Sequence, residues 1–271
     1  MSEMKNDRPL NYAEILQDHL PYRPWQEEKT RRLPGIQPLD MADWILMDSA
    51  YDAQMGYRDW LIAHRREAVF AQIEDFDPAP AQELCDAILD HVAGLKGYQV
   101  RADHVIRPDG VSVDLQSDVP LVIAARLVQN DLVIMERRAE GDVLTAAVLC
   151  FPASWSLHEK IGRNMWGIHE PVSDYDDNLD ARVTRLFDAI RVEQPLWRAN
   201  YLSYEDPDLF QPRTEDNRRH RGGDFMRVER QSLIRLPKTR AVIFGIHTFV
   251  VPMQAQWKAE LDALGNGASS I

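Results

Sequence analysis

The chain has 271 residues, of which 45% are hydrophobic, a composition typical of a globular protein with a sizeable core. Its 31 basic and 43 acidic residues give a formal net charge of −12, which argues against general nucleic-acid binding, because such binding depends on neutralising phosphates. The two cysteines, Cys85 and Cys150, are too few for a disulfide framework or a four-cysteine metal site.

The first part of the chain is predicted to be mostly helical. Residues 1–38 contain five prolines and are expected to form an arm with one short helix at 12–19. Two helical regions follow, at 40–73 and 81–95, because apolar residues recur at helical spacing in both. Residues 97–118 are rich in turn signals and are not assigned to a regular element.

The middle and the end of the chain carry strand signals. The predicted strands are 121–128, 132–137, 143–151, 196–203, 225–236 and 240–251. The turns between the first three are too short for a crossover helix, so these strands must pair antiparallel. Two helices are predicted between the third and fourth strands, one opened by a capping box at Ser156 and one that follows Asp177. The pattern predicts an α+β fold, in which an antiparallel sheet of at least five strands has helices packed on one face and a helical N-terminal layer.

One domain is predicted for residues 39–264, between the arm of 1–38 and a frayed tail of 265–271. The polar N-terminus lacks the apolar core of a signal peptide, and no apolar run is long enough to span a bilayer, so we expect a cytoplasmic protein without a membrane segment. Neither nucleotide-binding glycine signature appears, nor does HExxH or GxSxG. Any redox chemistry therefore requires reducing equivalents from a partner.

The segment 150–200 is the best candidate for a site, because it contains three tryptophans and two histidines. His169 stands two residues before Pro171, where the backbone is stiff enough to hold a metal-ligating imidazole. Its apolar neighbours, among them Trp166, suit a haem ligand better than the solvent-facing helix start at His158. The ordinary alternative is a histidine that is hydrogen-bonded in a turn.

Charged residues alternate along the predicted strand 225–236. Arg227, Glu229 and Gln231 fall on one face, and Arg230 falls on the other. Arginine suits carboxylates, and a glutamate in a pocket of low dielectric can hold a cationic amine or relay protons. An exposed, salt-bridged sheet face explains the same pattern about equally well.

Two other polar residues have ordinary structural interpretations that stand beside functional ones. Cys150 precedes a Pro turn, as a haem thiolate can, but a small buried hydrophobe at a strand end is the simpler interpretation. His247 lies in an apolar strand and is predicted to be a satisfied core histidine rather than a ligand.

Four motifs occur together in the second half of the chain: PxSWSxxEKxG at 152–162, IHxPV at 168–172, WRxN at 197–200 and RVERQSLxRLP at 227–237. In combination they resemble the family of haem-dependent oxidative N-demethylase alpha subunits, of the dimethylamine monooxygenase type. The similarity covers nearly the whole chain, including the N-terminal Pro-Gly-Ile and Asp-Trp segments.

This resemblance implies a PAS-like antiparallel domain that binds haem b and its iron. It implies the O2-dependent removal of a methyl group from a small secondary amine, which gives formaldehyde and a primary amine. It also implies partner subunits, namely an NADPH-dependent flavin and ferredoxin-type reductase and a tetrahydrofolate-binding subunit.

The resemblance also assigns roles to residues. Those expected in the cofactor site are His169, Trp166, Arg198 and Arg230, and those expected in catalysis are Glu229 and Tyr201. His169 is the expected iron ligand, and the two arginines are expected at the haem propionates. The chain departs from the family pattern at Tyr201, where tryptophan is expected, and at His247, where arginine is expected.

Two other functions remain open at this point. A PAS-like sensor would bind haem or a small ligand without turnover. An interaction subunit would bind no ligand, and its acidic surface would dock a partner.

Overall fold

The structure is a computed structural model of the chain, and it describes residues 11–31, 35–169, 184–214 and 222–264, with the backbone alone at residue 169. No helix within these ranges has both the length and the apolar character needed to cross a membrane.

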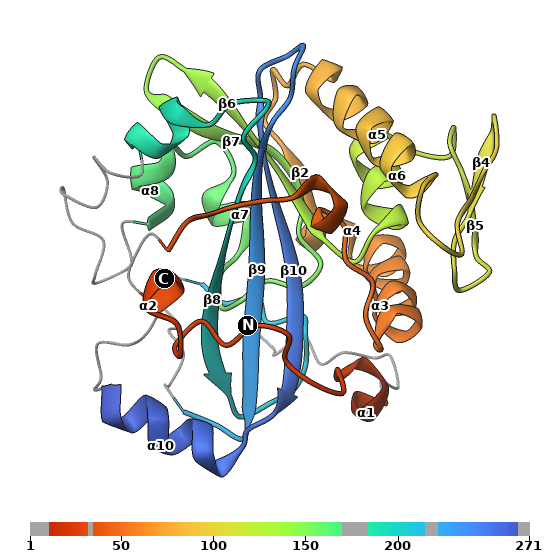
Figure 1. The fold of residues 1–271 in the computed structure, drawn as a ribbon. Helices are drawn as coiled ribbons and strands as arrows, with labels where there is room; N and C mark the ends of the chain where they lie inside the picture. Colours follow the sequence, from red (N-terminus) through yellow and green to blue (C-terminus); the bar gives the residue numbers. More distant parts are fainter. Residues whose placement is uncertain (1–10, 32–34, 170–183, 215–221, 265–271) are drawn as a thin grey trace.

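A seven-stranded antiparallel sheet forms the centre of the molecule (Figure 1). The strand order is β1-β8-β9-β10-β6-β7-β2. These strands are β1 (Gln37–Pro38), β2 (Phe70–Gln72), β6 (Asp131–Arg138), β7 (Gly141–Val148), β8 (Leu196–Tyr204), β9 (Phe225–Arg235) and β10 (Val242–Pro252). A small second sheet consists of β3 (Gln99–Val100), β4 (His104–Ile106) and β5 (Ser112–Asp114).

Helices surround the large sheet, and α3, α5 and α6 lie together on one side of it (Figure 1). The helices are α1 (Tyr12–Ile15), α2 (Glu28–Arg31), α3 (Tyr51–His64), α4 (Arg66–Val69), α5 (Ala79–Val92), α6 (Pro120–Leu127), α7 (Leu157–Lys160), α8 (Met165–His169) and α10 (Ala255–Leu264), with a 3-10 turn η1 (Met41–Asp43). Residues 184–189 are also helical. The α+β fold predicted from the sequence is therefore confirmed.

The prediction of a strand at 121–128 is wrong, because these residues belong to helix α6. All but one of the residues after Pro120 in this helix are buried, so the helix shows no polar face and no helical period in its sequence. Pro120 occupies the first turn of the helix, where its missing N–H leaves no hydrogen bond unmade. The other five predicted strands are present as β6 to β10.

The predicted helical region 40–73 is also shorter than expected. The helix α3 begins at Tyr51, so Trp44 and Met47 belong to the turns before it. At the other end, Phe70–Gln72 form the edge strand β2, which pairs with β7. The aromatic and small side chains at this end suit a short edge strand that covers the otherwise open side of β7.

The two faces of strands β8 to β10 are covered by different parts of the chain. The face that carries Arg198, Glu229 and Thr248 is here called the α8 face, because its apolar end packs against Met165 and Ile168 of α8. Strand alternation places the next residue of each strand on the opposite side.

That opposite side is here called the arm face, because the N-terminal arm covers it. Leu20 and Trp25 of the arm pack there on Tyr201, Val228 and Phe249. The arm passes in front of these strands in Figure 1 and joins the sheet through β1, which pairs with the start of β8. Each face therefore has its own core.

Candidate functional site

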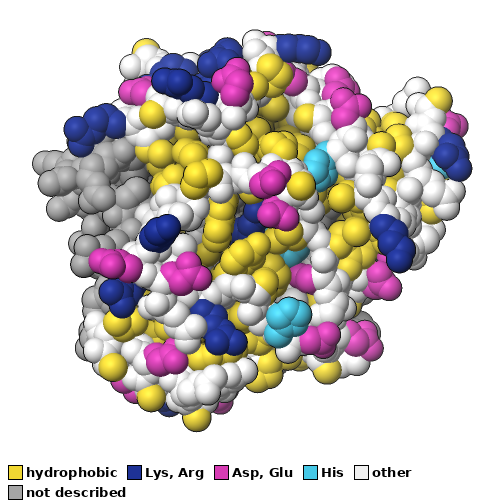
Figure 2. Space-filling model, in the orientation of Figure 1, with side chains coloured by type: hydrophobic (Ala, Val, Ile, Leu, Met, Phe, Trp, Pro, Cys, Tyr) yellow, Lys and Arg dark blue, Asp and Glu magenta, His cyan; other side chains and the backbone are white. Residues whose placement is uncertain are grey.

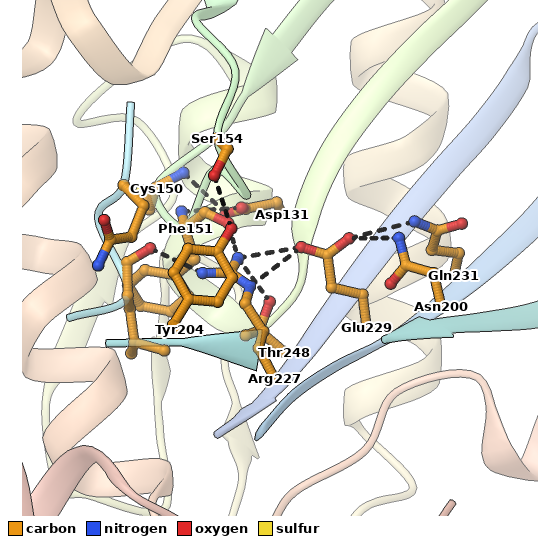
Figure 3. A network of polar contacts seen from close by, with 12 residues as sticks. Asp131, Cys150, Phe151, Ser154, Asn200, Tyr204, Arg227, Glu229, Gln231 and Thr248 are labelled. Carbon is orange, nitrogen blue, oxygen red and sulfur yellow. Dashed lines mark hydrogen bonds and ion pairs between the residues drawn. The ribbon is translucent and has the colours of Figure 1, made fainter. Parts of the chain in front are cut away.

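Glu229 lies at the centre of a buried polar network on the α8 face (Figure 3). The residue is 4% exposed, and its carboxylate accepts four hydrogen bonds. Oε1 accepts from Nε of Arg227 at 3.2 Å and from Nη2 of Arg227 at 3.0 Å. Oε2 accepts from Nδ2 of Asn200 at 3.1 Å and from Nε2 of Gln231 at 3.2 Å. The buried Glu229 is therefore held as an ion pair with Arg227 and has no acceptor position left over.

Strand geometry explains why these residues meet. Arg227, Glu229 and Gln231 alternate along β9, so their side chains share one face. Asn200 of β8 and Thr248 of β10 are the cross-strand partners of Glu229 on its two sides. The alternation predicted from the sequence is thus present, and its face is buried rather than exposed to solvent.

The carboxylate of Glu229 fixes the orientation of two amides. Asn200 and Gln231 turn their nitrogens toward Oε2 and their oxygens away from it (Figure 3). A reversed amide would set its oxygen against the carboxylate, so this orientation is the stable one. Both amide oxygens, Oδ1 of Asn200 and Oε1 of Gln231, are buried without a hydrogen-bond partner. A buried acceptor without a donor costs about 1–3 kcal/mol, so the pair indicates a place for a ligand that carries N–H or O–H groups.

Arg227 connects this network to the loop after β7. Its Nη1 donates to the carbonyl of Leu209 at 3.1 Å, and its Nη2 donates to the carbonyl of Phe151. The guanidinium also lies over the ring of Tyr204, 5.7 Å from the ring centre. Tyr204 in turn shares a 2.9 Å hydrogen bond with Ser154 of the same loop. The loop from Cys150 to Ser154 is thereby fastened to the α8 face.

A second buried ion pair holds the other side of this loop. Asp131 accepts from the backbone N–H groups of Cys150 and Phe151, both at 2.8 Å. Nη2 of Arg58 in α3 lies 2.9 Å from Oδ1 of Asp131, and neither side chain is exposed. The same nitrogen donates to the carbonyl of Gln129 at 2.7 Å. Helix α3 and the candidate site are therefore linked through one short loop.

Arg198 is the second predicted site residue on the α8 face. It lies on β8, across from Gln231 on β9, and it is half-buried. Burial lowers the pKa of Arg198 to about 10, while the charge of Glu229 opposes this shift. A guanidinium in this setting suits a carboxylate group of a ligand.

Helix α8 belongs to the same face of the sheet. Its residues Met165 and Ile168 pack on the apolar cluster around Leu233 and Ile246. Trp166 is 39% exposed. His169 ends the helix, and its side chain lies outside the described residues, as do residues 170–172 of the predicted motif. The backbone of residue 169 is thus placed at the end of α8, and the role of its side chain as a ligand stays a prediction.

The remaining two predicted site residues lie on the arm face. Arg230 is the neighbour of Glu229 in β9 and points to the opposite side of the sheet. Tyr201 packs its ring against Trp25, with 5.3 Å between ring centres, and burial raises the pKa of its hydroxyl. The structure therefore brings Arg198 and Glu229 together and separates Arg230 and Tyr201 from them.

The alternative ligands differ sharply in their surroundings. Cys150 is fully buried, and burial raises the pKa of its thiol to about 12. This keeps the sulfur protonated and favours the small buried hydrophobe proposed from the sequence. His158 is exposed on α7.

Asn200 and Gln231 were missed as site residues by the sequence reasoning. Each was nonetheless contained in a motif, Asn200 in WRxN and Gln231 in the alternating run of β9. The signal that identifies them is their register beside Glu229, which becomes visible only when β8 and β9 are paired.

One family model matches residues 35–266, which is most of the chain. Its description is "Haem-dependent oxidative N-demethylase, alpha subunit-like".

Proposed function

Because the chain belongs to the haem-dependent oxidative N-demethylase, alpha subunit-like family, we propose that it is the haem-binding oxidoreductase subunit that removes a methyl group from the nitrogen of a small amine. One observation supports the amine most directly. It is the pair of buried, unpartnered amide oxygens on Asn200 and Gln231, held beside the charge of Glu229 (Figure 3).

The residues of the α8 face suit a haem b group. The apolar cluster of Leu233, Ile246 and Met165 offers a wall for a porphyrin, and Arg198 offers a guanidinium for a propionate. His169 at the end of α8 would hold the iron, with Trp166 one turn before it. The sheet order also supports a PAS-like domain, because the β6–β7 hairpin is followed by helices and then by a three-stranded meander that pairs back onto β6.

Haem supplies the activation of O2 when it is bound. The side chains of the network bind and orient the amine. The charge of Glu229 is already matched by Arg227, so the contacts left for the amine are Asn200 Oδ1 and Gln231 Oε1, which accept hydrogen bonds from its N–H groups. A secondary ammonium ion carries two N–H groups, which equals the number of free amide oxygens. Glu229 therefore acts by orienting the two amides, because its acceptor positions are filled and its charge is matched by Arg227.

Replacing Gln231 by Met is expected to weaken the binding of a small secondary amine about tenfold, because one buried acceptor is lost while the side chain keeps its length. The binding constant is measured by titrating dimethylamine into the haem-loaded protein and following the haem absorbance. The control is Gln82→Met, at an exposed glutamine of α5, which should leave the constant unchanged. An unaltered constant in the Gln231 variant would show that this amide does not contact the amine.

The proposed function is tested with absorbance spectra of protein expressed with a haem precursor, in the oxidised, reduced and carbon monoxide-bound forms. The expected result is a Soret band of the histidine type that is lost or shifted in His169→Ala and kept in His158→Ala. Amine-dependent formation of formaldehyde, with an electron donor present, is the second expected result. A haem band without any formaldehyde would favour a sensor, and no haem band after reconstitution would contradict the proposal.

An alpha subunit implies partner subunits. We further propose that they are an NADPH-dependent flavin and ferredoxin-type reductase, which delivers electrons, and a tetrahydrofolate-binding subunit, which takes up formaldehyde. A cytoplasmic location stays a prediction from the sequence.

A further inference from the structure

A second buried polar group lies on the arm face, on the other side of the sheet from Glu229. Arg230 of β9 and His247 of β10 are direct cross-strand partners, and they are 2% and 0% exposed. Their side chains therefore lie next to each other. Figure 2 views the molecule from this side and shows charged and histidine surface among hydrophobic surface near its centre. We call the buried group formed by Trp44, Asn130, Arg230 and His247, which is defined by the contacts given below, the Arg230 recess.

His247 is held firmly at one nitrogen only. Its Nε2 lies 2.9 Å from Oδ2 of Asp48, and that carboxylate also accepts from the amides of Gln17 and Gln129. Burial raises the pKa of Asp48, but these hydrogen bonds outweigh it and leave the pKa below its usual value. An ionised carboxylate only accepts hydrogen bonds, so Nε2 of His247 is the donor to Asp48. The other nitrogen, Nδ1, is buried and has no hydrogen-bond partner.

Arg230 is a buried cation, and the carboxylate of the exposed Asp43 acts on its charge without forming an ion pair with it. Among the described residues, Arg230 forms a long hydrogen bond from Nη1 to the carbonyl of Trp44 at 3.4 Å, and its Nε is buried without a partner. The rings of Trp197 and Tyr22 lie 5.5 and 5.9 Å from the guanidinium carbon. Within the described residues it forms no ion pair, and burial lowers its pKa. Aromatic rings hold a guanidinium in place but do not replace an anion on its N–H edge.

Asn130, the residue before a third strand, adds a third unpartnered atom. It directly precedes β6, which pairs with β10, and its Oδ1 is buried without a donor. The space beside it depends on Gly245, since a Cβ there would lie 2.7 Å from Oγ of Ser232 and 3.5 Å from Nδ2 of Asn130. A glycine at this position thus leaves room for the side chains of Ser232 and Asn130 beside β10.

The chemistry of these atoms indicates a class of ligand. Ordered water would satisfy Nδ1 of His247 and Oδ1 of Asn130, but water does not balance the charge of Arg230. A carboxylate matches the N–H edge of a guanidinium, and a hydroxyl or amino group beside it supplies the donor that the other two atoms lack. Because Arg230 and His247 are adjacent, only one or two carbon atoms separate the two functions of such a molecule.

We propose that the Arg230 recess binds a small carboxylate that carries a hydroxyl or amino group. The carboxylate pairs with Arg230, and the donor group meets Nδ1 of His247 and Oδ1 of Asn130. This site is separate from the α8 face and does not depend on haem.

The test is isothermal titration of the full chain without haem, with glycolate as the probe and acetate as the probe that lacks a donor. Glycolate is expected to bind at least tenfold more tightly than acetate. Arg230→Met is expected to weaken glycolate binding at least tenfold. Arg230→Lys should also weaken it, because lysine keeps the charge but lacks the paired N–H groups that bind both oxygens of a carboxylate. The matched control is Arg23→Met, because Arg23 also lies over a tryptophan, Trp257, on the arm face but outside the recess.

His247→Gln separates the two parts of the ligand. Glutamine can still donate to Asp48 but has no atom equivalent to Nδ1. The affinity for glycolate should therefore fall to that for acetate, while the affinity for acetate stays unchanged. Near-ultraviolet circular dichroism checks that each variant is folded.

Two results would overturn the proposal. One is the absence of glycolate binding to the folded wild-type chain. The other is the loss of glycolate binding when the chain is loaded with haem, because the anion on Arg230 would then be a haem propionate. Unchanged glycolate binding in the haem-loaded protein is expected. If the chain binds glycolate but no haem, the proposal for the Arg230 recess is supported and the proposed function is contradicted.

Discussion

Glu229→Gln is expected to lower the free energy of unfolding by about 3 kcal/mol and to abolish amine-dependent turnover. The change removes the countercharge of Arg227, which is 1% exposed and has no other carboxylate within ion-pair distance among the described residues. It also sets an amide N–H₂ against the donors that now face the carboxylate. Urea unfolding followed by tryptophan fluorescence measures the loss of stability.

The matched control for this variant is Glu136→Gln in β6. The side chain of Glu136 is 19% exposed and lies 3.9 Å from Arg138, so its loss should cost less than about 1 kcal/mol. A double variant, Arg227→Met with Glu229→Gln, should cost less than the sum of the two single changes, because neither charge is then left alone. A Glu229→Gln protein as stable as the Glu136→Gln protein would show that the buried pair does not balance its charges in the way described.

Asp131→Asn is expected to lower the free energy of unfolding by about 3–5 kcal/mol, the range for breaking a buried ion pair by removing one partner. Arg58 would remain as a fully buried cation, and the new amide would turn a donor toward one of the two backbone N–H groups of the loop. The carbonyl of Phe151, which accepts from Arg227, would move with the loop. The haem-loaded variant should therefore also bind amine more weakly.

Asp118→Asn provides the comparison for Asp131. Asp118 pairs with Arg66 at 2.6 Å, but the side chains are 22% and 40% exposed, so its loss should cost no more than about 1 kcal/mol. Both variants are compared by the midpoint and slope of urea unfolding. Equal stability of the two would contradict the role given to Asp131.

The sequence predicted the strands well where alternation and turns agree. In β9 the alternation of Arg227, Glu229 and Arg230 gave the correct division between faces, because this division is a property of any extended backbone. Helix α6 was mistaken for a strand, because a short run of buried apolar residues has no period that distinguishes the two. Only its first residue, Pro120, signalled a helix.

The site was predicted less completely, because its contacts join distant parts of the chain. Nothing in the local sequence shows that Arg227 reaches the carbonyl of Phe151, 76 residues away. The bond between His247 and Asp48 spans 199 residues. His247 was expected to be a satisfied core histidine, and this is correct for Nε2 but not for Nδ1. Composition and spacing identified the residue types, and only strand pairing shows which of them meet.

The order of the strands has a consequence for how the protein is made. Strand β10 is in the middle of the sheet, between β9 and β6, yet it is the last strand to leave the ribosome. Until it is synthesised, no strand pairing joins the β6–β7 hairpin to the β8–β9 pair, and both present open strand edges. Long-range pairing of this kind is slow and exposes nascent chains to aggregation. A chain that stops before residue 242 therefore lacks the element that joins the two halves of its sheet.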